Sequence, residues 1–352
     1  MTPPEPHTPP AATEAPEAPE VPDAPAADWP RVPYLDDDDL VVAAEAAMAL
    51  NRPLLLTGEP GTGKTSFAKH LADTLAPRRF GLQRPLRLHT FITKSTSMAT
   101  DLFYRFDSLR RFHASHDPKM SQDNLAYLSF DALGLAILES HDWAEVSDLV
   151  PDAKDHPGKG VRSVVLIDEI DKAPRDFPND ILAEIDEGGF RIPELLDADG
   201  HVRQVQAAAG MRPLIVLTSN SEKNLPQAFL RRCVFHHISF PTDKAVLKKR
   251  LADIVSMHLT QAQGKLVDGA IDVFYNLRAE RDIDKPPATA ELRDWVQVLF
   301  DLARRSHRVP AETPLRALEL DHVRGTLGVL AKGKRDVEAA RRVLGDYYAK
   351  TA

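Results

Sequence analysis

Short apolar runs recur along the middle of the chain, and segments with helical spacing or long connections separate them. Five runs are apolar throughout or alternate with period two, as β-strands do: they are Leu54–Leu56, Leu86–Ile92, Val164–Ile167, Leu214–Leu217 and Val234–Phe240. Strands spaced in this way are typical of a parallel α/β sheet, because each crossover returns the chain to the same edge. The pattern therefore predicts a five-stranded parallel sheet with helices on both faces.

Helical spacing dominates the last third of the chain. From Thr242 onward no run predicts a strand, and five segments have the apolar periodicity of helices: they are Ala245–Leu259, Leu266–Glu280, Ala290–Arg305, Leu318–Leu330 and Lys334–Ala349. Two more helices are predicted beside the first strand, one starting at the acidic run Asp36–Asp39 and one over Ser66–Leu75. We expect an α/β domain over residues 34–241 and a smaller all-α lid domain over residues 242–352.

Two connections are longer than ordinary loops. Residues 94–160 separate the second and third strands and carry predicted helices over Asp101–Phe112 and Phe130–Leu138. Residues 189–211 contain two short alternating runs that predict a β-hairpin closed around Asp197–Gly200. We expect a helical insertion and a hairpin insertion, and insertions of this length usually have a function.

Residues 1–33 differ in composition from the rest of the chain. They contain eleven of the 28 prolines and almost no large apolar side chains. Such a segment cannot bury enough surface to offset the entropy lost on ordering, so we expect a disordered tail with polyproline II character. This tail either solubilises the chain or docks to a partner that recognises proline motifs.

The net charge of −8 comes largely from residues 1–40, which hold ten acidic side chains and one arginine. The remainder is close to neutral, which disfavours nucleic acid as a partner. The single cysteine, Cys233, excludes an internal disulfide and is typical of a reducing compartment. No apolar run reaches the length of a membrane span, and the amino-terminal residues lack the layout of a signal peptide. We therefore expect a cytoplasmic protein without a membrane partner.

One motif lies directly between the first predicted strand and the helix that follows it. It reads Gly58-Glu59-Pro60-Gly61-Thr62-Gly63-Lys64-Thr65, which is the phosphate-binding loop pattern G-x-x-x-x-G-K-[ST]. The glycines let consecutive backbone N–H groups and the helix start point at a polyphosphate. We expect Lys64 to reach the β- and γ-phosphates and the Thr65 hydroxyl to bind Mg²⁺. The sequence therefore predicts a nucleotide site made by all eight residues.

Polar residues follow two other predicted strands. Asp168 and Glu169 come directly after Val164–Ile167, and Asn220 follows the run Leu214–Leu217. Ligands of open α/β sheets bind at the carboxyl ends of the strands, so these side chains are expected beside the phosphate loop. Asp168 is expected to hold Mg²⁺, directly or through water, and Glu169 to polarise the water that attacks the γ-phosphate. Asn220 is expected to bind that water or the phosphate.

Two arginines, Arg231 and Arg232, stand where a predicted helix meets the fifth strand. One interpretation is an arginine finger that reaches the γ-phosphate held by a neighbouring subunit, which contributes roughly 10³–10⁵ in rate. The alternative is a pair of cations that satisfies carbonyl groups at a helix end. If the finger interpretation holds, efficient hydrolysis requires an oligomer.

Together these motifs resemble the AAA+ ATPases, and within them the MoxR-like branch. Gly58–Thr65 looks like Walker A, Val164–Glu169 like Walker B and Asn220 like sensor 1. Leu225–Cys233 is similar to the L-P-x-A-x-L-x-R-F segment of this branch, with Arg232 at the finger position. The resemblance covers roughly residues 35–305.

The long connections add to the resemblance. Phe190–Gln206 resembles the pre-sensor hairpin of this clade, and residues 94–160 take the place of its helix-2 insertion. Ser163–Pro193 resembles a subgroup of MoxR-like proteins often found beside von Willebrand factor A-domain partners. The resemblance implies binding of ATP and Mg²⁺, a ring oligomer, expected to be a hexamer, and chaperone-like remodelling or assembly of a protein client. It also implies a von Willebrand A-domain protein as partner.

The chain departs from the branch at the sensor 2 position, where an arginine usually opens the third lid helix. In Lys285–Trp295 that position falls on Glu291, and Arg293 follows two residues later. Either Arg293 substitutes in binding the nucleotide or sensor 2 is absent. Because of this departure, a second function stays open: a nucleotide-gated scaffold or signalling switch, in which turnover is slow. A nucleic-acid motor shares the same motifs and is less favoured because of the near-neutral body.

Overall fold

The computed structural model describes residues 34–35, 37–79, 85–117, 120–197, 199–220, 225–240, 243–259 and 264–350. The tail predicted over residues 1–33 lies outside these ranges.

A parallel sheet of five strands forms the centre of the α/β part, in the spatial order β2-β5-β8-β1-β9. The strands are β1 Leu54–Gly58, β2 Arg87–Ile92, β5 Ser163–Asp168, β8 Leu214–Ser219 and β9 Val234–Ile238. Every neighbouring pair is parallel. Each predicted apolar run forms one of these strands, so the expected five-stranded parallel sheet is confirmed.

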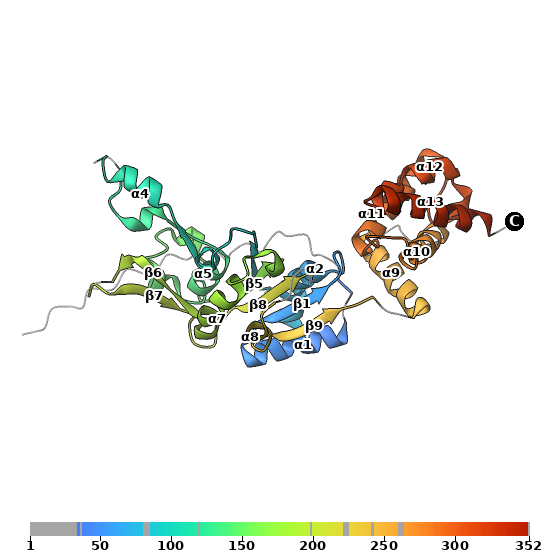
Figure 1. The fold of residues 1–352 in the computed structure, drawn as a ribbon. Coiled ribbons are helices and arrows are strands. Elements are labelled where there is room, and N and C mark those ends of the chain that lie inside the picture. The colour runs from blue at the N-terminus through green and yellow to red at the C-terminus, as the bar shows by residue number, and fades with distance from the viewer. Residues whose placement is uncertain are drawn as a thin grey trace, which may run out of the picture.

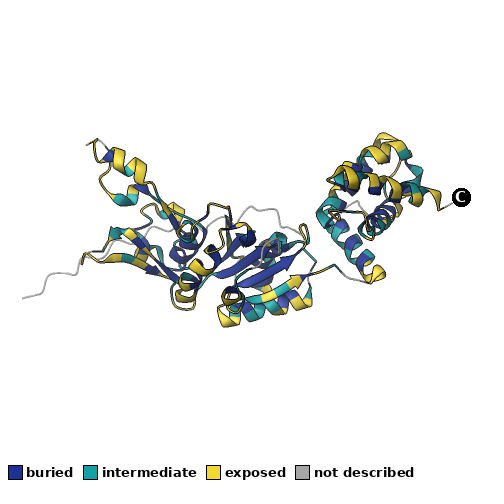
Figure 2. Cartoon of the chain, in the orientation of Figure 1, coloured by how far each residue is buried: buried dark blue, intermediate teal, exposed yellow. Residues whose placement is uncertain are grey.

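Helices cover both faces of the sheet (Figure 1). Leu54 and Leu56 of β1 pack with residues of α1 (Asp38–Leu50) and α2 (Lys64–His70). Leu55 points to the other face and packs with residues of α5 (Ala132–Leu138), α7 (Phe177–Glu187) and α8 (Gln227–Leu230). Because side chains alternate along a strand, the central strands are apolar at every position. Figure 2 shows this centre as the most buried part of the domain.

The helix after the phosphate loop starts earlier than predicted. It begins at Lys64, two residues before Ser66, because Gly63 takes a left-handed conformation (φ 95°) that ends the loop. A π-helical segment, Leu71–Leu75, joins α2 to α3 (Ala76–Arg79). The early start places the last two residues of the motif in the first helical turn.

The insertion over residues 94–160 is mixed rather than helical. The predicted helix Asp101–Phe112 is wrong in its first half, which forms a short 3-10 helix and strand β3 (Tyr104–Phe106) paired with β4 (Leu128–Phe130). Tertiary packing overrides the helical spacing there, because the rings of Phe103 and Tyr104 lie against Phe190. The side chain of Asp107 accepts a hydrogen bond from Arg110 N and starts α4 (Ser108–Ala114). The second predicted helix begins at Ala132, and α6 (Trp143–Val146) follows it.

The predicted hairpin is present as β6 (Gly189–Leu196) and β7 (Val202–Gln206), with an irregularity between Ile192 and Leu196. The hairpin and α4 lie at one end of the molecule, and the all-helical part lies at the opposite end (Figure 1). The two insertions and the lid therefore flank the sheet from opposite sides.

The described residues beyond Asp243 contain helices and no strand, as predicted. They are α9 Lys244–His258, α10 Lys265–Arg278, α11 Thr289–Arg305, α12 Leu320–Gly325 and α13 Lys334–Ala349. The predicted helix Leu318–Leu330 is interrupted: α12 ends at Gly325, and a 3-10 turn, Leu327–Val329, follows. The interruption frees the Thr326 hydroxyl to accept the indole N–H of the buried Trp295 at 2.7 Å. Across the described ranges, every helix is too short or too polar to cross a bilayer.

Candidate nucleotide-binding and hydrolysis site

The phosphate loop follows β1 at the carboxyl edge of the sheet and folds around the Lys64 side chain. The Lys64 ammonium is buried and donates to the main-chain oxygens of Gly58 and Glu59, each at 2.9 Å. Burial lowers the pKa of Lys64, and the nearby carboxylates, Asp168 first among them, partly offset this effect. A cation held by two carbonyl groups can exchange them for phosphate oxygens.

Two loop glycines have positive φ and leave no room for a side chain. A Cβ atom on Gly58 (φ 148°) would lie 2.5 Å from the carbonyl oxygen of Ile238. A Cβ atom on Gly61 (φ 74°) would lie 2.7 Å from the Cβ of Ala288 in the lid. The loop is therefore wedged between β9 and the lid, and glycine is required at both positions.

The Asp168 carboxylate lies at the end of β5 and receives two hydroxyl groups. Thr65 Oγ1 donates to Asp168 Oδ1 at 3.1 Å, and Thr218 Oγ1 donates to the same oxygen at 2.5 Å. A hydroxyl beside a carboxylate, at the mouth of a phosphate loop, is a donor set that fits Mg²⁺. The two predicted metal ligands, Thr65 and Asp168, therefore lie together.

Glu169 has a strained backbone and a restrained side chain. Its φ and ψ of 59° and 48° lie in the left-handed region, which costs a non-glycine residue roughly 1 kcal/mol or more. Its N–H donates to Thr218 Oγ1 at 2.9 Å, and its carboxylate pairs with Lys172 at 2.6 Å. The left-handed backbone at Glu169 thus follows directly on the last residue of β5.

Asn220 follows β8 and lies beside Glu169. Asn220 Nδ2 donates to Glu169 Oε1 at 3.4 Å, and Asn220 N donates to the buried Asp171 at 3.3 Å. The three polar residues predicted for this edge, Asp168, Glu169 and Asn220, thus form one cluster next to the phosphate loop.

A cleft of ≈ 150 Å³ lies between the phosphate loop and the lid. Tyr34 lines it and packs over the loop side of α2, with its ring stacked on His70 and edge-on to Phe67. The remaining wall comes from the end of β9, from α9, which contributes Arg250 and His258 beside several apolar side chains, and from the start of α11. The predicted sensor 2 substitute, Arg293, also lines the cleft, and its guanidinium pairs with Asp294 at 2.8 Å.

Arg231 and Arg232 lie at the opposite edge of the sheet from this cluster. Val234 follows the two arginines closely in the chain and pairs with Leu54, the first residue of β1. The phosphate loop lies at the other end of β1, after its last residues. A five-residue strand separates the two edges by roughly 16 Å. Arg232 pairs with Asp186 at 3.2 Å, and both side chains are about half exposed, at 49% and 53%. The structure does not bring the two arginines to the phosphate loop of their own chain.

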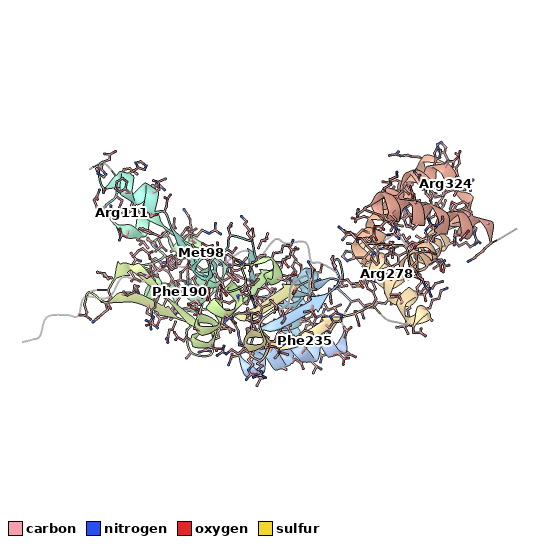
Figure 3. All side chains as sticks on the ribbon, viewed as in Figure 1. Met98, Arg111, Phe190, Phe235, Arg278 and Arg324 are labelled. Atoms are coloured by element: carbon pink, nitrogen blue, oxygen red, sulfur yellow. The ribbon has the colours of Figure 1, made fainter. Side chains whose placement is uncertain are left out.

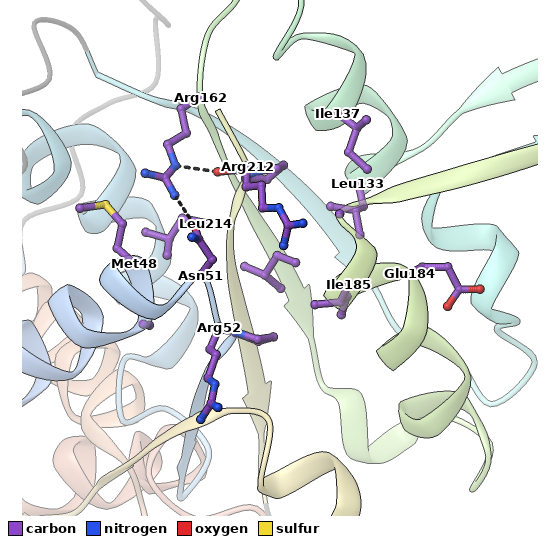
Figure 4. A pocket seen from close by; sticks show the side chains of 15 residues that line it. Met48, Asn51, Arg52, Leu133, Ile137, Arg162, Glu184, Ile185, Arg212 and Leu214 are labelled. Atoms are coloured by element: carbon purple, nitrogen blue, oxygen red, sulfur yellow. Dashed lines mark hydrogen bonds between the residues drawn. The ribbon is translucent and has the colours of Figure 1, made fainter. Parts of the chain in front are cut away.

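A second pocket lies at that amino-terminal edge, beside the starts of β1 and β8 (Figure 4). Its volume is only ≈ 20 Å³. Arg162 closes it by donating to the main-chain oxygen of Arg212 at 2.6 Å and to Asn51 at 3.4 Å. This pocket is too small for a nucleotide.

Three residues of the site were not predicted from the sequence: Thr218, Tyr34 and Arg278. Thr218 had a usable signal, because it is a polar residue near the end of an apolar strand at the same edge as Asp168. Arg278 had none, since it pairs with Glu59 at 2.7 Å from a helix far away in sequence.

A phosphate loop after β1, an acidic pair after β5 and a polar side chain after β8, on one edge of a parallel sheet, define a P-loop nucleoside triphosphate-binding protein. Residues 54–242, more than half of the chain, match the sequence model of the ATPase family associated with various cellular activities (AAA). The chain belongs to this family. No curated protein matches it at the level of sequence.

Solved structures with a similar arrangement include NtrX from Brucella abortus in complexes with ADP and with ATP. Each is 13% identical to this chain. The match to the ADP complex covers 83% of this chain and 55% of NtrX, with a TM-score of 0.40. The match to the ATP complex covers 81% of this chain and 52% of NtrX, with a TM-score of 0.41. PCH-2 of C. elegans is 18% identical, with 89% of this chain and 66% of PCH-2 covered and a TM-score of 0.31. The chain spans about half the length of the NtrX structures that it matches.

Proposed function

We propose that this protein is an Mg²⁺-dependent ATPase that converts ATP and water to ADP and phosphate. One observation carries the proposal: Asp168, Glu169 and Asn220 form a polar cluster next to a phosphate loop with a buried lysine. A kinase does not need a carboxylate placed to activate water. The adjacent pair of acidic residues supports hydrolysis instead.

The loop residues bind the phosphates of ATP. Lys64 exchanges the carbonyl oxygens of Gly58 and Glu59 for phosphate oxygens, and the backbone N–H groups at the start of α2 point at the same anion. Thr65 and Asp168 would hold Mg²⁺, which would neutralise negative charge on the phosphate groups. Glu169 and Asn220 orient a water molecule that attacks the γ-phosphorus as the bond to the bridging oxygen breaks.

The cleft beside the loop takes the adenine base. The apolar side chains of its wall and the ring of Tyr34 suit a flat heterocycle, and it opens directly onto Gly61, Thr62 and Gly63. Arg293 lies in the same wall, so it is placed to contact the nucleotide as a substitute for sensor 2. This placement supports ATP bound between the α/β part and the lid.

Arg232 acts on the ATP of a neighbouring copy. It lies at the sheet edge opposite its own phosphate loop, and its weak, half-exposed pair with Asp186 leaves it available to a partner. Arg231 is the neighbouring cation. The proposal therefore includes an oligomer, and we propose a ring, with six subunits as the first size to test.

We further propose that the chain is MoxR-like and cytoplasmic and remodels or assembles a protein client. Two inserted elements, α4 and the β6–β7 hairpin, project from the end of the molecule opposite the lid (Figure 1). α4 exposes two large apolar side chains, Leu109 at 66% and Phe112 at 63%. Exposed apolar side chains on a projecting element support contact with another protein. A von Willebrand A-domain protein is the proposed partner.

A second candidate function is a nucleotide-gated scaffold with slow turnover. The ion pair between Glu169 and Lys172 favours it, because a carboxylate bound to lysine at 2.6 Å must be released before it can orient water. In this alternative the ATP-bound assembly is the output of the protein.

Comparison of wild type with Glu169→Gln tests the function. The variant should bind ATP like wild type while phosphate release falls at least about 100-fold, since it keeps the size of the side chain and loses the charge. Glu187→Gln, on the exposed end of α7, is the matched control and should release phosphate normally. Equal phosphate release by wild type and Glu169→Gln contradicts the proposed ATPase. Glu169→Gln should remain in its ATP-bound state, so its effect on a client separates the two functions. Loss of the effect indicates a motor, whereas a retained effect indicates a scaffold.

A further inference from the structure

Arg278 is the last residue of α10 and lies on the side of the lid that faces the sheet (Figure 3). Its side chain is only 14% exposed although it carries a full charge. A guanidinium is seldom buried to this extent without several partners.

The guanidinium joins three segments that are distant in sequence. Arg278 Nη2 pairs with Glu59 Oε2 of the phosphate loop at 2.7 Å, and Nη1 donates to the Pro287 carbonyl oxygen at 2.5 Å. Its Cζ atom lies 4.0 Å from the ring centre of Phe240, which follows β9 on the way to the lid. The planar fork of arginine can make these contacts at once, whereas a lysine ammonium cannot.

Glu59 connects this guanidinium to the phosphate-binding lysine. The carboxylate of Glu59 binds Arg278, and its main-chain oxygen accepts hydrogen bonds from Lys64 Nζ at 2.9 Å and from Thr62 Oγ1 at 2.8 Å. Movement of the Lys64 ammonium toward a phosphate group removes one of the contacts that fix Glu59. The position of Lys64 is therefore transmitted to the lid through a single residue.

The Pro287 contact sets a second point where the lid meets the loop. Ala288, the next residue, lies close to Gly61: a Cβ atom added to Gly61 would lie 2.7 Å from the Cβ atom of Ala288. Helix α11 follows Ala288 and starts with two uncharged residues, Thr289 and Ala290. Its first arginine, Arg293, is paired with Asp294. Arg278 thus provides the lid cation that binds Glu59 of the phosphate loop, whereas Arg293 lines the adjacent cleft.

We propose that Arg278 is a positioning residue that holds the lid on the phosphate loop through Glu59 and thereby sets nucleotide affinity and release. It acts on the loop and on the Pro287 carbonyl, not on the nucleotide. The inference rests on the proposed binding of ATP at the loop.

The test is a double-mutant cycle with Glu59→Gln and Arg278→Gln, read out as dissociation of the fluorescent nucleotide mant-ADP. Glu59→Gln should release mant-ADP about tenfold faster than wild type, which corresponds to the loss of one charge-assisted hydrogen bond. Arg278→Gln should release it at least as fast, because it also loses the contacts with Pro287 and Phe240. The double variant should be no faster than Arg278→Gln, because both changes remove the same ion pair. Arg324→Gln, an exposed arginine on α12 at the far side of the lid, is the matched control and should behave like wild type.

A charge swap separates positioning from packing. Glu59→Arg combined with Arg278→Glu should recover part of the affinity that each single change loses. Arg278→Lys, which keeps the charge but not the fork, should lie between wild type and Arg278→Gln. The Glu59 side chain is half exposed, so Glu59→Gln tests the inference even if Arg278 variants fold poorly. Unchanged mant-ADP release in Glu59→Gln, or losses that add in the double variant, overturns the inference. If wild type itself binds no mant-ADP, the proposed function fails instead.

Discussion

The hydroxyl of Thr218 donates to the carboxylate of Asp168 at 2.5 Å. The same hydroxyl accepts the N–H of Glu169 at 2.9 Å, so one side chain of β8 holds both acidic residues at the end of β5. The expected metal ligand and the expected water-orienting residue are therefore fixed by a common neighbour.

Replacement Thr218→Val should lower the turnover number about 10- to 100-fold, the usual cost of losing a residue that orients a metal ligand. Valine keeps the shape of threonine and removes only the hydroxyl, and the loss of the acceptor for the Glu169 N–H should also cost the fold roughly 1–3 kcal/mol. Steady-state phosphate release at several Mg²⁺ concentrations measures the effect. Thr218→Ser keeps the hydroxyl and should retain most of the activity; equal losses in both variants speak against the orienting role.

Replacement Lys64→Ala should abolish nucleotide binding, raising the dissociation constant for ATP at least about 100-fold. The variant also loses the two hydrogen bonds from the Lys64 ammonium to the carbonyl oxygens of Gly58 and Glu59, which should lower the melting temperature slightly. Titration calorimetry with ATP and thermal unfolding measure the two effects. An unchanged ATP affinity would refute the assignment of the phosphate loop.

Replacement Arg232→Ala should leave ATP binding intact and reduce turnover about 10³-fold, the lower end of the range for arginine fingers. The exposed pair with Asp186 contributes at most about 1 kcal/mol to stability, so the fold should be unaffected. Asp186→Asn removes the same pair but keeps the arginine, and it should stay active. Loss of turnover in Asp186→Asn as well would indicate that the ion pair, not the finger, matters.

A buried ion cluster predicts an acid-dependent part of the stability. Glu139 binds Arg87 and His89, each at 2.8 Å, and Ser163 at 3.1 Å. Burial by itself raises the pKa of Glu139, but these three partners lower it below its usual value. A carboxyl whose folded pKa is depressed stabilises the fold above its unfolded pKa, near 4.5, and loses this contribution as the pH falls through the folded value.

The variant Glu139→Gln should therefore be about 2 kcal/mol less stable than wild type at pH 7, as expected for lost hydrogen bonds to a charged group. The difference should shrink below pH 4.5. Urea unfolding of both proteins between pH 7 and pH 3 measures it, because the loss occurs below pH 4.5. A difference that stays constant over this range would show that the charge of Glu139 does not stabilise the fold.

The sequence allowed the sheet and its polar edge to be predicted for a physical reason. Strands buried on both faces must be apolar at every position, so β1, β5 and β8 stand out as short runs. The carboxyl ends of parallel strands share one edge, and this places Lys64 and Asp168 together although they are far apart in the chain. The chemistry of the phosphate loop then follows from local spacing alone.

What could not be predicted depends on contacts between distant residues. The helical spacing of Asp101–Phe112 conceals strand β3, because the ring of Phe190, on a later hairpin, determines how Phe103 packs. The ion pair of Glu59 and Arg278 has no local signal in either segment. To place Arg232 at the far edge of the sheet, one must know the register of β9 against β1, which the structure provides.

We propose that ATP is hydrolysed between two copies of the chain, by the phosphate loop of one and Arg232 of the other. Mixing Lys64→Ala with Arg232→Ala tests this shared site, with phosphate release measured against the mixing ratio. Each variant alone should be inactive. The mixture should recover activity, because Lys64→Ala supplies an intact Arg232 to the ATP bound by Arg232→Ala. A mixture that releases no more phosphate than the two variants measured separately would contradict hydrolysis between subunits.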